Sequence, residues 1–302
     1  MVYTTFWPGD ARLAITISMM FEANGQPISG AGGPISEPIK PGYPDLATNT
    51  YFEYGMREGI PRLLDLFDRC KIRVSSFMIG QAVDKNPRLA REIAARGHEV
   101  AAHGRTWEPQ YALSREEERV FIQDSVESIE RATGQKPVGY NCYWIRDSVN
   151  TLELLQELGF VYHIDDLMSH DEPFIQRING HSFVTVPYTL HLNDIVSFDF
   201  PNYAPSEHLQ VLKDEFDQLY AEGAQRRRMM VVGTHDRISG HPNRIRVLEE
   251  FIAYAQAHPG VWFATKKEIA QWALQTPEVT PLVERERPEI SGMPAGHSSM
   301  KV

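Results

Sequence analysis

The sequence predicts an α/β fold, a deformed (β/α) barrel of mostly parallel strands in a single domain. Strand-like apolar runs alternate with amphipathic helical segments along most of the chain, and the number of these units favours a barrel. The length of 302 residues suits one such barrel. We expect the barrel over residues 1–276 and a tail over 277–302, where Pro, Ser and Gly replace the periodicity and predict an extended or disordered chain.

The first half of the chain holds the expected elements and one long insertion. A buried strand is expected over 13–20, and the Gly-, Pro- and Ser-rich stretch 23–48 lies within an insertion over 23–55. Such loops usually serve a site as a lid or wall, so we expect this one near the site. The elements that follow are a helix near 56–69, a strand at 73–79, a helix at 87–96, a strand at 99–102 and an acidic helix near 114–133. That last helix opens with the capping box Ser114 to Glu117.

The second half repeats the alternation without any sign of another domain. The expected elements are a strand at 137–140, a helix near 150–158, strands at 160–162 and 183–187, a helix near 206–222, a strand at 229–233 leading into His235, a helix at 243–257 and a last strand at 261–263.

The composition excludes several classes of partner. The formal net charge of −10 argues against nucleic acid and anionic membranes, which would repel the average surface. No apolar run reaches the ~20 residues of a membrane span, and the first residues do not resemble a signal peptide. Two cysteines without a CxxC pattern indicate reduced thiols. We therefore expect a cytoplasmic protein that acts on a small molecule.

Three reactive side chains are expected at the carboxyl ends of strands, where a parallel barrel gathers its chemistry. Glu22 follows the first strand, His103 the strand at 99–102, and His235 the strand at 229–233. Taken singly, Glu22 is as easily a turn carboxylate facing water, and a strand-end histidine is more often structural. His235 is the stronger candidate, because Asp236 and Arg237 follow it and three such residues are costly to bury without a purpose.

Neighbouring residues are candidates for binding the substrate. Arg105 and Trp107 follow His103, and Asn141, Tyr143 and Trp144 follow the strand at 137–140, while Asp236 follows His235. His163 and the pair Asp165-Asp166 are weaker candidates for the same rim.

The segment from Arg96 to His103, with Gly97-His98-Glu99 at its centre, resembles the second motif of the polysaccharide deacetylases, carbohydrate esterase family 4. The order of segments matches that family from about residue 10 to 274. The metal site departs from the family pattern, since one carboxylate, Glu22, stands where the family has two aspartates. Trp107 replaces the second histidine, and Asn141-Cys142-Tyr143-Trp144 replaces Arg-x-Pro-Tyr.

These departures resemble a branch that includes deacetylase-like allantoinases and cyclic imide hydrolases (imidases). The insertion ends in Tyr51-Phe52-Glu53-Tyr54-Gly55, which adds Tyr54 to the substrate-binding candidates. His103 with Trp107, and Val186-Pro187-Tyr188-Thr189-Leu190 with Asn193-Asp194, also fit this branch. The His235-Asp236-Arg237-Ile238 form is closer to the imidase-like members. The resemblance also implies a homo-oligomer.

The resemblance implies a hydrolase that opens the C–N bond of a cyclic amide. We expect Glu22 to act as the base, His235 as the acid or oxyanion partner, and His103 to position water or the carbonyl. Trp107, Tyr143 and Trp144 would form an apolar wall that raises the pKa of a carboxylate toward neutrality. The cofactor is either none or a weakly bound zinc held by Glu22, His103 and His235.

Three other functions stay open at this point. An allantoinase-type ureide hydrolase shares most of the pattern. A polysaccharide or N-acetyl-sugar deacetylase would need an open groove and strict metal dependence. A catalytically inactive barrel that binds a small molecule would keep ligand binding after Glu22 or His103 is changed.

Overall fold

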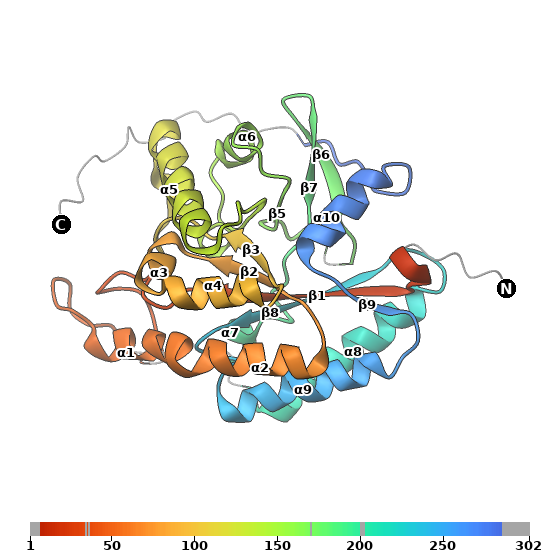
Figure 1. The fold of residues 1–302 in the computed structure, drawn as a ribbon, viewed down its shortest axis with the longest axis horizontal. Helices are drawn as coiled ribbons and strands as arrows, with labels where there is room; N and C mark the ends of the chain where they lie inside the picture. The colour runs from red at the N-terminus through yellow and green to blue at the C-terminus, as the bar shows by residue number, and fades with distance from the viewer. Residues whose placement is uncertain (1–6, 34, 36, 170, 200–202, 286–302) are drawn as a thin grey trace.

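The computed structural model describes residues 7–33, 35, 37–169, 171–199 and 203–285. Strands and helices alternate around one sheet (Figure 1). The strands are β1 (Leu13–Phe21), β2 (Ser75–Met78), β3 (Glu99–Ala102), β4 (Gly139–Tyr140), β5 (Tyr162–His163), β6 (Phe174–Ile178), β7 (His181–Thr185), β8 (Met229–His235) and β9 (Val261–Phe263). The helices are α1 (Leu46–Tyr54), α2 (Ile60–Cys70), α3 (Gly80–Lys85), α4 (Pro87–Ala95), α5 (Arg115–Thr133), α6 (Thr151–Glu157), α7 (Asp194–Asp199), α8 (Pro205–Glu222), α9 (Pro242–Gln256) and α10 (Lys266–Gln275).

The sheet has the strand order β6-β7-β5-β4-β3-β2-β1-β8, with β9 paired to β1. Every pairing is parallel except that of β6 with β7. Within the described residues no pairing joins β8 to β6, so the sheet curls without closing. The segment before α7 partly covers this gap, because Asn193 forms an isolated parallel bridge with Gly233. The predicted deformed barrel is confirmed.

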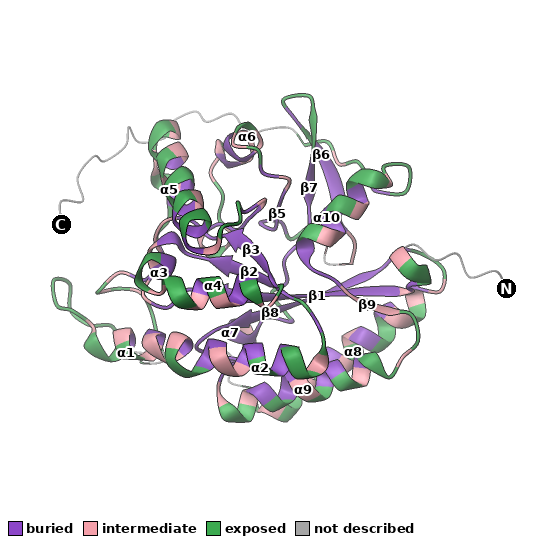
Figure 2. Ribbon diagram, in the orientation of Figure 1, coloured by how far each residue is buried: buried purple, intermediate pink, exposed green. Residues whose placement is uncertain are grey.

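Both faces of β1 are buried, as expected for a barrel strand. Its odd-numbered residues, such as Ile15 and Ile17, pack against the outer helices. Its even-numbered residues face the barrel interior, where Ala14 and Met20 join residues of α10. Figure 2 shows most of the sheet buried, apart from β9 and the hairpin end of β6 and β7, while exposed residues gather on the outer sides of the helices.

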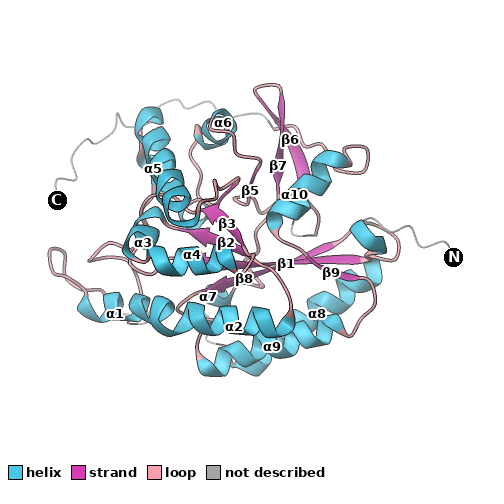
Figure 3. Ribbon diagram, in the orientation of Figure 1, coloured by secondary structure: helices cyan, strands magenta, loops and turns pink. Residues whose placement is uncertain are grey.

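The helices form two groups around the sheet (Figures 1 and 3). One group contains α2, α8 and α9, and the other contains α3, α4 and α5. The predicted capping box is present, since Ser114 and Glu117 form both of its hydrogen bonds at the start of α5. No helix in the described ranges combines the length and apolar composition that a bilayer span requires.

The insertion at 23–55 differs in one respect from the expected loop. Its last part is the helix α1, which begins at an Asp45 cap and continues through a π-helical turn, Gly55–Gly59, into α2. Mixed polar and apolar residues give α1 a weak periodicity, which explains why the sequence pattern does not predict it. In the predicted tail, residues 281–283 run beside β6, and residues 286–302 lie outside the described part of the chain.

Candidate active site

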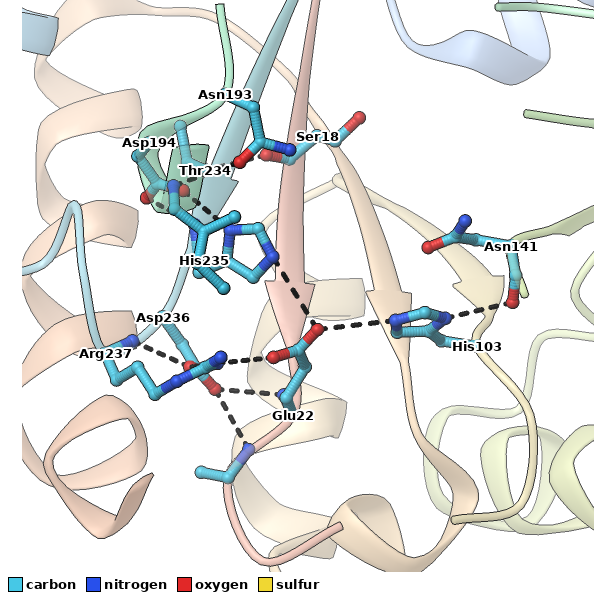
Figure 4. Close-up of polar contacts among 12 residues, drawn as sticks. Ser18, Glu22, His103, Asn141, Asn193, Asp194, Thr234, His235, Asp236 and Arg237 are labelled. Carbon is cyan, nitrogen blue, oxygen red and sulfur yellow. Dashed lines mark hydrogen bonds and ion pairs between the residues drawn. The ribbon is translucent and has the colours of Figure 1, made fainter. Parts of the chain in front are cut away.

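Glu22, His103 and His235 meet at the carboxyl end of the sheet (Figure 4). Glu22 and His103 directly follow β1 and β3, and His235 ends β8. The Glu22 Oε1 atom lies 3.3 Å from Nε2 of His103 and 3.7 Å from Nε2 of His235. All three residues are buried, and Glu22 Oε1 has no well-aligned hydrogen-bond partner among the described residues. The convergence predicted from the strand ends is therefore present.

The other oxygen of Glu22 is engaged by a guanidinium. Arg237 Nη1 donates to Glu22 Oε2, and both side chains are buried. Burial alone would raise the pKa of Glu22, but Arg237, and after it His235 and His103, hold that pKa far below its ordinary value. The expectation of a pKa raised toward neutrality is wrong, because the sequence pattern did not reveal the Arg237 pair. Glu22 is a carboxylate throughout the physiological pH range.

His235 is held by a second buried carboxylate. Its Nδ1 donates to Asp194 Oδ1 at 2.6 Å, and its backbone N–H donates to Asp194 Oδ2 at 2.7 Å. Ser239 adds two further donors to the same oxygen. Burial lowers the pKa of His235, yet Asp194 and Glu22 outweigh burial and raise it above its ordinary value. His235 therefore favours the imidazolium form, with Nε2 directed at Glu22.

His103 has a fixed orientation as well. Its Nδ1 lies 2.9 Å from the backbone carbonyl oxygen of Asn141. A carbonyl only accepts hydrogen bonds, so Nδ1 carries the proton and, in the neutral ring, Nε2 is left as an acceptor. Nε2 is the atom that faces Glu22 Oε1. The site thus contains one imidazole, that of His103, whose Nε2 can accept a hydrogen bond, and another, that of His235, whose Nε2 favours donating one.

Asp236 holds the end of β1 in place. Its carboxylate accepts from the backbone N–H groups of Glu22 at 3.0 Å, Ala23 at 3.1 Å and Arg237 at 2.7 Å. We expected Asp236 to bind substrate, and this is corrected because its oxygens are already taken by the backbone. A Cβ at Gly55 would lie 2.5 Å from the Asp236 carboxyl carbon, so glycine is required for this packing.

A cavity of about 40 Å³ opens over the three catalytic candidates. Of the predicted substrate-binding residues, Trp107, Asn141 and Trp144 line it. Tyr143 packs edge-on against Trp107, with ring centroids 4.6 Å apart and an angle of 62° between the rings. The remaining lining residues are Met20, Cys142, Ile145, Tyr188, Leu190, Asn193, Ile195 and Val196. Of the three expected wall residues, Trp107 and Trp144 therefore line the cavity, and Tyr143 does not.

Two predicted substrate-binding residues lie elsewhere. Arg105 turns toward α3 and α5, where it donates to Asp84 at 2.7 Å and to Ser128 at 3.0 Å. Tyr54 stacks on His241 with ring centroids 4.1 Å apart. Neither lines the cavity, so both expectations are corrected.

Several residues of the site were not assigned a role there from the sequence. Asp194 orients His235, Arg237 neutralises Glu22, and Tyr188 and Asn193 line the cavity. Asp194, Asn193 and Tyr188 stood in the segments that carry the family resemblance, and that was the available signal. Trp144 and Ile145 both adopt positive φ, at 49° and 53°, which is a strained backbone conformation for these residue types. No sequence pattern predicts this conformation.

The donor set does not fit the zinc site considered from the sequence. Arg237 already neutralises Glu22, and its guanidinium would repel a dication beside that carboxylate. No group of three His, Cys, Asp or Glu side chains in the described part of the chain has the arrangement of a metal site. The roles of Glu22, His103 and His235 are therefore assigned without a metal.

Comparisons with known proteins identify the family. Residues 47–163 match the polysaccharide deacetylase family. The crystal structure of a probable polysaccharide deacetylase from Pseudomonas aeruginosa PAO1 is 32% identical, with a TM-score of 0.82 and coverage of 89% of this chain and 93% of that one. The structure of Puue allantoinase is 30% identical, with the same TM-score and coverage. A putative polysaccharide deacetylase from Schizosaccharomyces pombe is 29% identical, with 91% of this chain and 95% of that protein covered. The chain therefore belongs to the polysaccharide deacetylase family.

Proposed function

We propose that this protein is a hydrolase that opens the C–N bond of a cyclic amide, with a cyclic imide as its substrate class. The observation that carries the proposal is Glu22 Oε1, a buried carboxylate oxygen that lies between two oriented imidazoles and has no well-aligned hydrogen bond. It faces a small, largely apolar cavity. The likeness to Puue allantoinase supports a cyclic substrate with ring amides.

The nucleophile in this proposal is a water molecule between Glu22 and His103. Glu22 is too weak a base to take the proton, because Arg237 holds its pKa far below the usual range. Its Oε1 orients the water instead. Nε2 of His103 accepts the proton while the water oxygen bonds to the carbonyl carbon. The base role proposed for Glu22 from the sequence thus passes to His103.

His235 supplies the proton for the leaving nitrogen. Asp194 favours its imidazolium form, and Nε2 faces the same space as Glu22 Oε1. As the tetrahedral intermediate collapses, the C–N bond breaks and the Nε2 proton moves to the nitrogen. His103 then carries the proton taken from water, and exchange with solvent restores both rings. An imide nitrogen leaves more readily than a simple amide nitrogen, so this single acid is sufficient.

The cavity favours an imide over the alternatives. A ureide such as allantoin brings several N–H donors, whereas Glu22 and His103 are engaged by the reaction and much of the remaining wall, including Met20, Trp107, Ile195 and Val196, offers no acceptor. A sugar polymer needs an open groove for its neighbouring units, whereas the bulky side chains of Trp107, Trp144 and Leu190 surround this cavity. The planar ring and methylene groups of an imide match aromatic and aliphatic walls.

Ring-opening assays test the proposal directly. Chelator-treated protein would be assayed with and without added zinc on succinimide, phthalimide, hydantoin, allantoin and an N-acetylglucosamine oligomer. We expect turnover of an imide, unchanged by the chelator or by zinc. Turnover of allantoin alone would favour the ureide hydrolase. Activity only on the acetylated sugar would contradict the proposal. The absence of activity on every substrate would also contradict it and would favour the inactive barrel that binds a small molecule.

We also propose that the protein is a cytoplasmic homo-oligomer. The insertion presents exposed apolar side chains at Ile28, Ile35, Tyr43 and Leu46. A second copy packed on this loop would remove them from water. Light scattering of the wild type and of an Ile28→Ser, Leu46→Ser variant checks this, and an unchanged monomeric mass for both would contradict it. Cys70 and Cys142 are free thiols, as a reducing compartment maintains.

A further inference from the structure

Tyr188 is a buried tyrosine whose hydroxyl lies near the Asn193 amide and whose hydroxyl hydrogen has no well-aligned acceptor among the described residues. The residue is 4% exposed and lines the catalytic cavity, and its hydroxyl forms no hydrogen bond of good geometry with any described residue. A buried hydroxyl without a partner costs stability, and folded proteins rarely leave one. Such a group in a catalytic cavity calls for a ligand atom that completes it.

The chain makes room for this hydroxyl beside His235. A Cβ at Gly233, two residues before His235 on β8, would lie 2.9 Å from the Tyr188 hydroxyl and 3.2 Å from Nδ2 of Asn193. The Asn193 amide is only weakly engaged by the protein, because Nδ2 has a long contact with the Thr189 carbonyl at 3.4 Å and approaches the Tyr188 hydroxyl without good hydrogen-bond geometry. Figure 4 shows Asn193 on the same side of β1 as His235. The Tyr188 hydroxyl and the Asn193 amide, which are both hydrogen-bond donors, therefore lie together beside Gly233.

The electrostatic surroundings keep the Tyr188 hydroxyl a donor. Burial, and then the negative charges of Asp194 and Glu22, raise the pKa of Tyr188 well above its ordinary value. The phenol is therefore protonated at neutral pH. A protonated phenol near these carboxylates can offer its hydrogen to an oxygen that becomes negative during the reaction.

We propose that Tyr188 is a catalytic residue, with its hydroxyl donating to the carbonyl oxygen of the substrate as that oxygen gains charge. Asn193 Nδ2 is the second donor of the same oxyanion site. This inference rests on the proposed ring-opening function and adds what that mechanism lacks, namely a group for the tetrahedral oxyanion. His235 is then free to act as the acid. A polar imide carbonyl is selected in the same way, because an apolar ring would leave both donors unpaired.

The variant Tyr188→Phe tests the role because it removes only the hydroxyl. We expect kcat to fall by about 10²-fold, with KM changed by less than about threefold, because an oxyanion donor acts mainly in the transition state. The melting temperature should stay the same or rise, since no protein hydrogen bond is lost. A structural tyrosine would give the opposite pair of results.

Tyr162→Phe is the matched control. Tyr162 is also fully buried in the barrel, but its hydroxyl donates to Glu99 Oε1 at 2.7 Å. Its loss should lower the melting temperature while kcat stays within about threefold. An unchanged kcat in Tyr188→Phe, or a melting temperature that falls as far as in Tyr162→Phe, would overturn the proposal. If the wild type opens no cyclic amide, the ring-opening function fails by itself, and the melting comparison still shows whether the Tyr188 hydroxyl is unbonded.

Discussion

Two of the buried glutamates lie at the sheet, one at each end, and their surroundings differ. Glu99 begins β3, and its two oxygens accept from Ser75 Oγ at 2.6 Å, Tyr162 OH at 2.7 Å and the Lys267 backbone at 2.9 Å. Glu22 follows β1 at the opposite end, with one oxygen held by Arg237 and the other near two histidines but without a well-aligned hydrogen bond. The protein satisfies both oxygens of Glu99 by hydrogen bonds, whereas it does so for only one oxygen of Glu22.

The pKa values of the two glutamates are shifted in opposite directions for the same reason. Burial raises the pKa of Glu99, because its neighbours are mainly neutral donors and Lys266 contributes least. Burial acts on Glu22 in the same direction, yet the Arg237 guanidinium reverses the outcome. A nearby permanent cation, rather than burial, decides whether the carboxylate is ionised. The comparison indicates that Glu22, a carboxylate with one oxygen that lacks a well-aligned hydrogen bond, serves the reaction. Glu99, whose oxygens are hydrogen-bonded within the protein, serves the fold.

The largest expected effect separates these two roles directly. Glu22→Gln should lower kcat by about 10³-fold, because the amide no longer orients water as a carboxylate does. It should also lower the free energy of unfolding by about 3 kcal/mol, because Arg237 stays buried with only the more distant Asp236 carboxylate, at 3.6 Å, as its countercharge. Steady-state kinetics and denaturant unfolding of the same preparation measure both.

Glu99→Gln is the control for that experiment. Its neighbours are hydroxyl and backbone donors, and the Tyr162 hydroxyl can turn to accept from the new amide. The free energy of unfolding should fall by only about 1 kcal/mol, and kcat should stay within about threefold. Equal losses of activity in the two variants would mean that the carboxylates share a role and would break the comparison.

Asp194→Asn should have the next largest effect, and it tests whether the Asp194 charge maintains the imidazolium form of His235. The variant keeps the size of the side chain but removes the charge that favours the His235 imidazolium. The proposed acid form exists below the raised pKa of His235 and is lost as pH rises through it. The alkaline fall of kcat should therefore begin at lower pH in the variant, and kcat at neutral pH should drop by about 10²-fold. A pH–rate profile that keeps its alkaline limb in place would show that His235 is not the acid.

The sequence predicted those parts of the site that depend on strand position. Glu22, His103 and His235 were found because parallel strands bring their carboxyl ends to one edge. The contacts of side chains with each other were not predictable in the same way. Arg237 was noticed beside His235, but its direction toward Glu22 depends on how β8 lies against β1. The same limit explains α1, whose residues show little periodicity and which forms because Asp45 caps it and α2 continues it.

Arg105 gives the smallest expected effect and tests this distinction between position and direction. Its place two residues after His103 suggested a substrate contact, but its guanidinium lies with Asp84 and Ser128 on the outer side of the barrel. The pair with Asp84 is about one-third exposed at each side chain, so its contribution is reduced by solvent. Arg105→Ala should therefore lower the free energy of unfolding by less than about 1 kcal/mol and leave kcat and KM unchanged. A rise in KM of tenfold or more would return Arg105 to the site and would show that the loop after β3 changes its course when substrate binds.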